Sequence, residues 1–133
     1  MARQIYVNLA IADVERTRAF YTALGFRVEE KYSGEKSLCL AIEENIYVML
    51  LAREYFQTFT PKAVTDARES TEVLVCISCD SRAEVDELVA KAVAAGGRIP
   101  REKQDLGFMY GHAFEDLDGH IWELAYMEPN GQG

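Results

Sequence analysis

The chain has 133 residues, 49% of them hydrophobic, and carries a formal net charge of −8 with a pI near 4.8. This composition predicts one globular domain with an apolar core and excludes a largely disordered chain. An acidic chain without a basic surface is not suited to bind nucleic acid or anionic membranes.

The first half of the chain predicts the order strand, helix and three strands. The stretch QIYVNLAIAD (residues 4–13) alternates apolar and other side chains, as in a strand covered on one face. Asp13 is placed to cap a helix over residues 13–24, which Gly25 ends in a left-handed conformation. Strands are expected at 26–33, 36–43 and 45–52, followed by a connector over 53–70 with a helical turn at Tyr55 and Phe56.

The same order returns in the second half. TEVLVCISCD (71–80) predicts a strand, and Ser81 and Glu84 form a capping box for a helix over residues 81–95. Three strands follow, a short one in GRIPRE (97–102) and longer ones at 107–116 and 120–127 that meet at the hairpin signal Asp118-Gly119.

The repeated order predicts an α+β fold from two tandem βαβββ units, at about 4–52 and 71–127 of a single domain. Asp13 and Asp80 fall at matching points of the two units. Two such units can form a curved, eight-stranded mixed sheet, a half-barrel with its helices on the outer face. The inner face is then a cup in which we expect a small-molecule ligand.

Three cysteines, Cys39, Cys76 and Cys79, occur in a sequence with no signal-peptide pattern and no apolar stretch of membrane-spanning length. We therefore expect a cytoplasmic protein with reduced thiols. Residues three apart on a strand point to opposite faces, so CISC does not suit one zinc ion. Buried structural cysteines are the favoured interpretation.

Strand alternation indicates which side chains face the cup. Glu123 is assigned to the cup, because Trp122 and Leu124 are better suited to the core beneath the helices. The same rule assigns to the cup Tyr6, Asn8, Val48, Leu50, Leu74, Cys76 and Ser78. His112 faces the cup or the helices with equal weight, and an ordinary hydrogen-bonded strand histidine is favoured over a ligand-binding one.

The layout, with NLAIADVERTRAFYTALGF near the start and FEDLDGHIWEL near the end, resembles the glyoxalase, bleomycin-resistance and extradiol-dioxygenase superfamily. This family has the vicinal oxygen chelate fold, and the resemblance covers residues 4–127. It implies a cup in which histidines and glutamates hold a divalent metal that polarises vicinal oxygens of the substrate. These ligands come from the first and fourth strands of each unit, and their places fall on Tyr6, Leu50, Leu74 and Glu123.

Only Glu123 matches a metal ligand of the family. Leucine cannot ligate and neutral tyrosine is a poor ligand, so a divalent metal cofactor is not favoured. If the ligand positions on the first and fifth strands were shifted by two residues, Gln4 and Glu72 would face the cup instead. With Glu123 they would form a weak set of metal ligands that has only oxygen donors. Glu123 is alternatively a general base, a counter-charge for a cationic ligand, or a structural carboxylate bonded to Tyr6 or Asn8.

The resemblance implies two main functions. The first is a diverged enzyme, a lyase or oxidoreductase, with Glu123 as base or orienting group and Tyr6 as hydrogen-bond donor. In it, Asn8, Leu50, Leu74, Ser78 and His112 contact the ligand.

The alternative is a non-enzymatic homodimer that sequesters cationic drugs, as bleomycin-resistance proteins do. The low pI and the aromatic residues Tyr55, Phe56 and Phe59 fit this alternative. An accessory protein with an unfilled cup is a third reading. We expect a homodimer, and Glu123 close to Tyr6 or Asn8.

Overall fold

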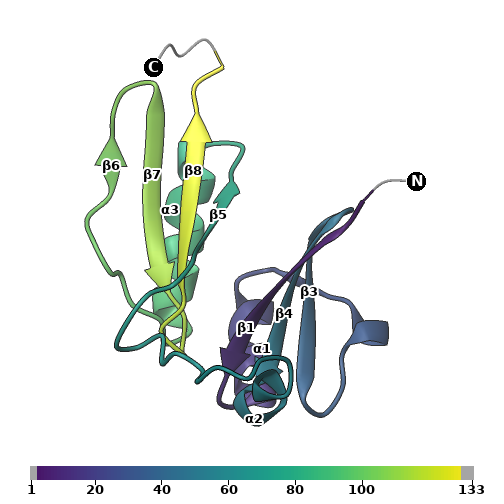
Figure 1. The fold of residues 1–133 in the computed structure, drawn as a ribbon. Coiled ribbons are helices and arrows are strands. Elements are labelled where there is room, and N and C mark those ends of the chain that lie inside the picture. The colour runs from purple at the N-terminus through teal and green to yellow at the C-terminus, as the bar shows by residue number, and fades with distance from the viewer. Residues whose placement is uncertain (1–2, 130–133) are drawn as a thin grey trace. The chain divides into compact units, whose positions relative to one another are not determined.

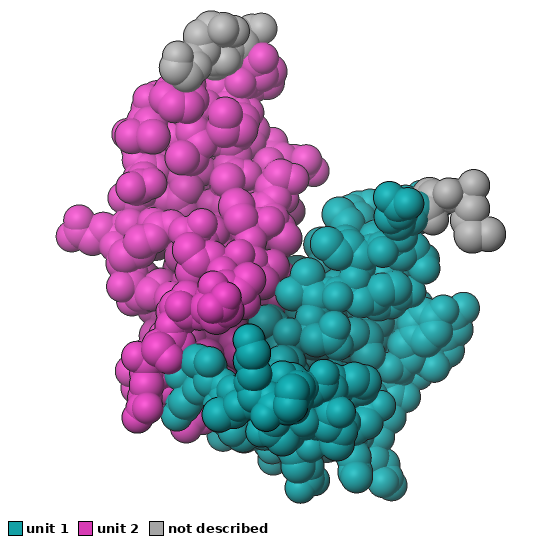
Figure 2. All heavy atoms as spheres, in the orientation of Figure 1, with its two compact units in different colours: residues 1–66 teal, residues 67–133 magenta. Residues whose placement is uncertain are grey.

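The computed structural model describes residues 3–129, which form two four-stranded sheets with helices packed on them (Figure 1). The chain divides into two compact units, Met1–Asp66 and Ala67–Gly133 (Figure 2). Within residues 3–129, the helices are too short and too polar to cross a membrane.

Unit 1 contains a mixed sheet in the order β1-β4-β3-β2, in which β1 and β4 are parallel and the other neighbours antiparallel. Its elements are, in chain order, β1 (Ile5–Ile11), α1 (Val14–Ala23), β2 (Arg27–Val28), the 3-10 turn η1 (Glu30–Tyr32), β3 (Ser37–Glu43), β4 (Ile46–Ala52) and α2 (Arg53–Gln57).

Unit 2 repeats this topology in the order β5-β8-β7-β6, again with one parallel pair, β5 and β8. Its elements are β5 (Leu74–Ser78), α3 (Arg82–Ala94), β6 (Gln104–Asp105), β7 (Met109–Glu115) and β8 (Ile121–Met127). The predicted α+β fold class with two βαβββ units is confirmed, and the strands are hydrogen-bonded as two sheets of four.

Both long helices begin at the predicted caps. The Asp13 carboxylate accepts a hydrogen bond from the Arg16 amide at 2.9 Å, and Gly25 follows α1 with φ of 95°. At α3, Ser81 Oγ accepts from the Glu84 amide at 3.0 Å, while the Glu84 carboxylate accepts from the Asp80 amide at 2.6 Å. The bonds to the Arg16 and Glu84 amides satisfy donors that the first helical turn leaves without partners.

In unit 2, the face of the sheet beneath α3 holds the apolar core. Trp122, Phe114 and Leu124 are fully or almost fully buried there, and α3 adds Val85 and Val89. Along β8 these buried residues alternate with half-buried ones, as the sequence pattern predicts for a sheet covered on one face. Glu123 therefore lies on the opposite face, away from α3.

The predicted face of β4 is wrong by one residue. Leu50 is 0% exposed and lies beside Leu9 and Leu38 in the core of unit 1. Val48 is buried in the same way, while Tyr47 and Met49 occupy the face that β1 shares through Tyr6 and Asn8. The seven apolar residues of IYVMLLA carry no alternation, so only pairing with β1 sets the face.

Two short strands also differ from expectation. The chain leaves β2 after Val28 and turns through η1, because the Ser33 hydroxyl donates to the Glu29 carbonyl at 2.9 Å and accepts from the Cys39 amide at 3.0 Å. The edge strand of unit 2 is β6, not GRIPRE, which contributes only a bridge between Arg98 and Glu115. Pro100 interrupts GRIPRE because it cannot donate a ladder hydrogen bond.

Candidate functional site

The centre of the candidate site is an ion pair on the open face of unit 2, which we define as the face of its sheet turned away from α3. One oxygen of Glu123 accepts a hydrogen bond from Arg101 Nη2 at 2.8 Å. Glu123 lies mid-strand in β8, between Cys76 of β5 and Ala113 of β7. Arg101 reaches it from the segment between α3 and β6.

The surroundings of this ion pair are mainly apolar. Leu74 and Cys76 are exposed on β5, and Ile121 and Ala125 flank Glu123 along β8. Partial desolvation, together with the charge of Glu123, raises the pKa of the Cys76 thiol, and the Arg101 charge opposes this shift. Cys76 is therefore a neutral thiol at neutral pH. Ser78 lies on the same face at the end of β5.

The open face of unit 1, turned away from α1, carries a cluster of three tyrosines. The rings of Tyr6 and Tyr47 stack with centroids 4.8 Å apart, and Tyr32 meets both edge-on at 6.4 and 6.5 Å. The Tyr6 hydroxyl donates to Gln4 at 2.9 Å, and Asn8 donates to the Tyr6 carbonyl at 3.2 Å.

Desolvation and the neighbouring tyrosines raise the pKa of Tyr6, so its hydroxyl stays protonated and can donate a hydrogen bond at neutral pH. Tyr6 and Asn8 belong to unit 1, whereas Glu123, Leu74 and Ser78 belong to unit 2. The expectation that Glu123 lies close to Tyr6 or Asn8 stays a prediction.

His112 lies on the other face of unit 2, and its assignment to a ligand in the cup is corrected. It pairs with Leu124, whose side chain is in the core, so it points toward α3. There it lines a hollow of 830 Å³ together with Asp86, Val89 and Lys103. Burial lowers the pKa of the imidazole, so His112 is mostly neutral at neutral pH. Cys76 likewise departs from the prediction of buried cysteines, whereas Cys39 and Cys79 are buried.

The residues at the implied metal-ligand places do not fit a divalent ion. On β4, Met49 and not Leu50 lies on the open face, so the position of the metal ligand from the fourth strand falls on Met49. The thioether of methionine is a poor ligand for a divalent ion. Leu74 has no donor atom, and the Tyr6 hydroxyl is protonated. The Glu123 carboxylate already binds the Arg101 guanidinium. Between residues 3 and 129, no three His, Cys, Asp or Glu side chains are grouped as a metal site.

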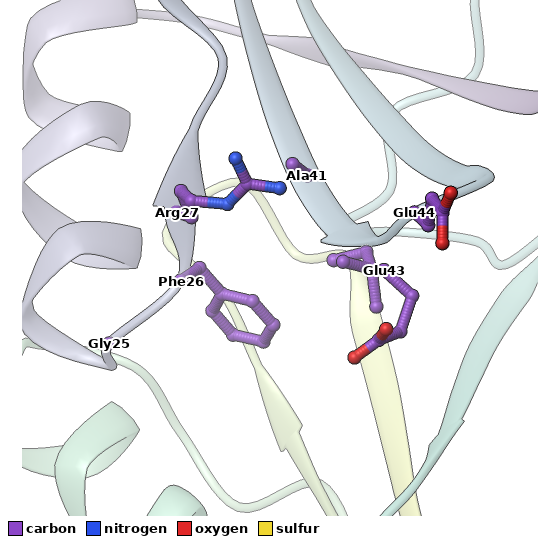
Figure 3. Close-up of a pocket in the computed structure, with 7 residues that line it drawn as sticks. Gly25, Phe26, Arg27, Ala41, Glu43 and Glu44 are labelled. Atoms are coloured by element: carbon purple, nitrogen blue, oxygen red, sulfur yellow. The ribbon is translucent and has the colours of Figure 1, made fainter.

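A separate hollow of 440 Å³ lies in unit 1, between the start of β2 and the end of β3 (Figure 3). Phe26, Arg27, Glu43 and Glu44 line it with mixed charge. None of the predicted site residues contributes to it, and we assign it no function.

Sequence reasoning missed Arg101, Met49, Tyr32 and Tyr47. Arg101 lies in no motif, and its contact with Glu123 joins residues 22 positions apart. Met49 and Tyr47 were hidden by the uniform hydrophobicity of β4. Tyr32 fell within a predicted strand that is a 3-10 turn.

Residues 3–124 match the model of the Glyoxalase/Bleomycin resistance protein/Dioxygenase superfamily. No curated protein sequence matches the chain significantly. A hypothetical protein from S. aureus of known structure is 30% identical, with a TM-score of 0.80, over 95% of this chain and 94% of that chain.

Two further solved structures are similar in fold alone. A glyoxalase-related enzyme from Fulvimarina pelagi is 23% identical, with a TM-score of 0.79, over 95% of this chain and 88% of that one. A fosfomycin resistance protein from Listeria monocytogenes is 18% identical, with a TM-score of 0.69, over 98% of both chains.

Proposed function

Because the chain belongs to the glyoxalase, bleomycin resistance protein and dioxygenase superfamily, we propose that it binds a small organic molecule against the open faces of its sheets, without a resident divalent metal. The observation that carries this proposal is the Arg101–Glu123 pair. A cationic side chain holds the carboxylate that the resemblance assigns to a metal, amid mainly apolar side chains. Apolar surfaces with a few directed polar groups are typical of small-molecule sites.

Within this proposal the protein is a diverged enzyme, a lyase or oxidoreductase of its superfamily. Tyr6 donates to the ligand the hydrogen bond that it otherwise gives to Gln4. Glu123 orients the reacting group or accepts its proton. Asn8, Leu74 and Ser78 contact the ligand, whereas the buried Leu50 does not.

Metal analysis of the purified protein, combined with thermal unfolding, tests the proposal. We expect substoichiometric zinc, nickel, manganese and iron, and no change in Tm on adding either EDTA or these ions. A screen of small carboxylates, carbonyl compounds and aromatic amines should contain compounds that raise Tm by mass action. One tightly held metal ion per chain would contradict the proposal, as would the absence of any stabilising compound.

The tyrosine cluster of unit 1 favours a second function, sequestration of cationic aromatic drugs. Tyr6 and Tyr32 are 39% and 44% exposed, and tyrosine faces attract cations. Ethidium titration distinguishes this function, because its fluorescence reports binding. Tyr47→Leu should weaken ethidium binding severalfold, whereas the control Tyr126→Leu, in β8 of unit 2, should not. Equal affinities in the wild type and Tyr47→Leu would rule the cluster out.

A further inference from the structure

We infer that Arg101 anchors the ligand of the proposed site, and that the group it binds is an oxygen acceptor of the ligand, a carboxylate or a carbonyl. This inference rests on the proposed function and adds the chemical class of the ligand. It also gives Glu123 a different role, as the residue that positions Arg101.

Arg101 leaves several of its hydrogen-bond donors unused. A guanidinium has five N–H groups. One donates from Nη2 to Glu123 at 2.8 Å, and one donates from Nη1 to the Glu102 carbonyl at 3.2 Å. Within residues 3–129 the remaining donors have no partner, and 38% of the side chain is exposed. A planar fork of free N–H groups is suited to a carboxylate or carbonyl oxygen.

The strands of unit 2 place no positive charge on its open face. None of the residues that β5, β7 and β8 present on this face is cationic, as the strand register shows. Arg101, which reaches the face from outside the strands, supplies its positive group. A ligand amine at Glu123 would meet a carboxylate whose charge is balanced 2.8 Å away, and the guanidinium would repel it.

The Arg101–Glu123 pair lies on a mainly apolar part of the open face of unit 2. The Glu123 carboxylate and the Glu102 carbonyl hold the guanidinium at a sheet face that also presents Leu74, Ile121 and Cys76. Hydrogen bonds to an ionised group gain strength where water is partly excluded. A ligand with an apolar body and one oxygen acceptor thus matches both the surface and the donor.

Three probes of one shape test the inference: benzoate, benzamide and benzylamine. Their dissociation constants are measured by protein NMR titration against the wild type, Arg101→Gln, Glu123→Gln and the control Arg98→Gln. Arg98 is an exposed arginine of the same segment with no side-chain partner within residues 3–129. We expect benzoate or benzamide to bind more tightly than benzylamine. Arg101→Gln should weaken that binding about tenfold, as for loss of a charge-assisted hydrogen bond.

Arg98→Gln should leave the affinities unchanged. Glu123→Gln should raise the affinity for benzoate, because a like charge is removed while the amide oxygen can still accept the hydrogen bond from Arg101. If Arg101→Gln does not fold, by circular dichroism, Arg101→Lys replaces it, and loss of the fork should still weaken binding severalfold.

Two results would overturn the inference. Preferred binding of benzylamine, lost in Glu123→Gln, would refute it while leaving the proposed small-molecule function in place. An affinity for benzoate and benzamide that is equal in the wild type and Arg101→Gln, or too weak to measure at millimolar concentration, would also refute it. The thermal-unfolding screen then decides separately whether the proposed function stands.

Discussion

Glu123 and Arg101 are both accessible to water, with side chains 29% and 38% exposed. Exposed ion pairs contribute little to stability, because solvent screens them and because ordering two long side chains costs entropy. The pair should therefore contribute little to folding stability, which is compatible with its proposed role in ligand binding. Removing the charge of Glu123 tests this. A carboxylate that anchors the fold should lower the free energy of unfolding when it is neutralised, and a carboxylate that only positions a ligand should not.

Glu123→Gln should change the free energy of unfolding by less than about 1 kcal/mol. Urea unfolding at neutral pH measures the change. Glu87→Gln is the matched control, because it breaks another exposed carboxylate pair, with Lys91 at 3.1 Å on α3. A loss of more than about 2 kcal/mol in Glu123→Gln alone would show that the carboxylate is a structural anchor.

Cys79 should make the stability of unit 2 fall as the pH rises through the alkaline range. Burial, together with the negative charges of Glu84 and Asp80, raises the pKa of the Cys79 thiol from 9.0 to about 11. Between these pH values the unfolded chain loses the proton while the folded chain keeps it. Deprotonation then favours unfolding, so the contribution is complete below pH 9 and is lost as the pH rises toward 11.

The wild type should accordingly lose Tm more steeply between pH 9 and 11 than Cys79→Ala does. Differential scanning calorimetry across this range measures both slopes. Cys76→Ala is the control, because the pKa of this exposed thiol is raised less than that of Cys79, so its removal should change the slope less. Parallel slopes in the wild type and Cys79→Ala would exclude Cys79 as the cause.

At the scale of elements, the turn between β7 and β8 positions Glu123. The Asp116 carboxylate accepts hydrogen bonds from the amides of Asp118 at 2.9 Å and His120 at 2.8 Å. Gly119 adopts φ of 92°, and a Cβ there would lie 2.6 Å from the Arg68 amide nitrogen. Both backbone conformation and space therefore require glycine at this position.

Gly119→Ala should destabilise the protein by about 2 kcal/mol or more, because a strained φ adds to a backbone clash. Gly25→Ala separates the two causes: φ at Gly25 is 95°, but a Cβ there meets nothing within 4 Å. We expect this control to cost only about 1 kcal/mol. Urea unfolding measures both variants, and equal losses would show that the contact with Arg68 can relax.

Helices with a capping residue and strands with alternating hydrophobicity were predictable from the sequence. Strands whose buried face depends on which strand they pair with were not. Asp13, Ser81 and the Asp118-Gly119 turn each have a local chemical cause, and β8 alternates clearly. By contrast, the face of β4 is decided by pairing with β1. For His112 the strand does alternate: His112 shares its face with Tyr110 and Phe114, and the small residues Gly111 and Ala113 lie on the other face. This alternation alone assigns His112 to the core face.

The candidate site shows the same division. Glu123 could be found because a turn motif precedes it by a fixed number of residues. Its partner Arg101 could not, because an irregular segment after α3 brings it to the sheet, and no period or motif describes such a segment.

At the scale of the whole molecule, the two units have kept one topology and diverged in chemistry. The helix caps are Asp13 and Ser81, so the counterpart of Asp13 is Ser81 and not Asp80 as predicted. The strand pair Asn8–Met49 of unit 1 corresponds to Cys76–Glu123 of unit 2. Unit 1 presents stacked tyrosines on its open face, and unit 2 presents an ion pair. The chemistry that each open face offers is thus aromatic in unit 1 and ionic in unit 2.

Both units also leave apolar side chains exposed at edge strands, and this supports the expectation of a homodimer. Ile5 of β1 and Leu74 of β5 are 55% and 49% exposed, and each lies on a strand at the edge of its sheet. Edge strands with exposed apolar residues promote association. We predict a homodimer at micromolar concentration.

Light scattering coupled to gel filtration should give twice the 15.0 kDa mass of the chain. If the dimer is stable, Tm should rise with protein concentration, because association stabilises only the folded chain. Ile5→Asp and Leu74→Asp place a charge at each edge in turn, and the control Val93→Asp places one at a 45% exposed position on α3. Loss of the dimer in only one edge variant would identify the interface. A mass of 15.0 kDa for the wild type, with a Tm independent of concentration, would contradict the homodimer and show that both edge strands stay uncovered in solution.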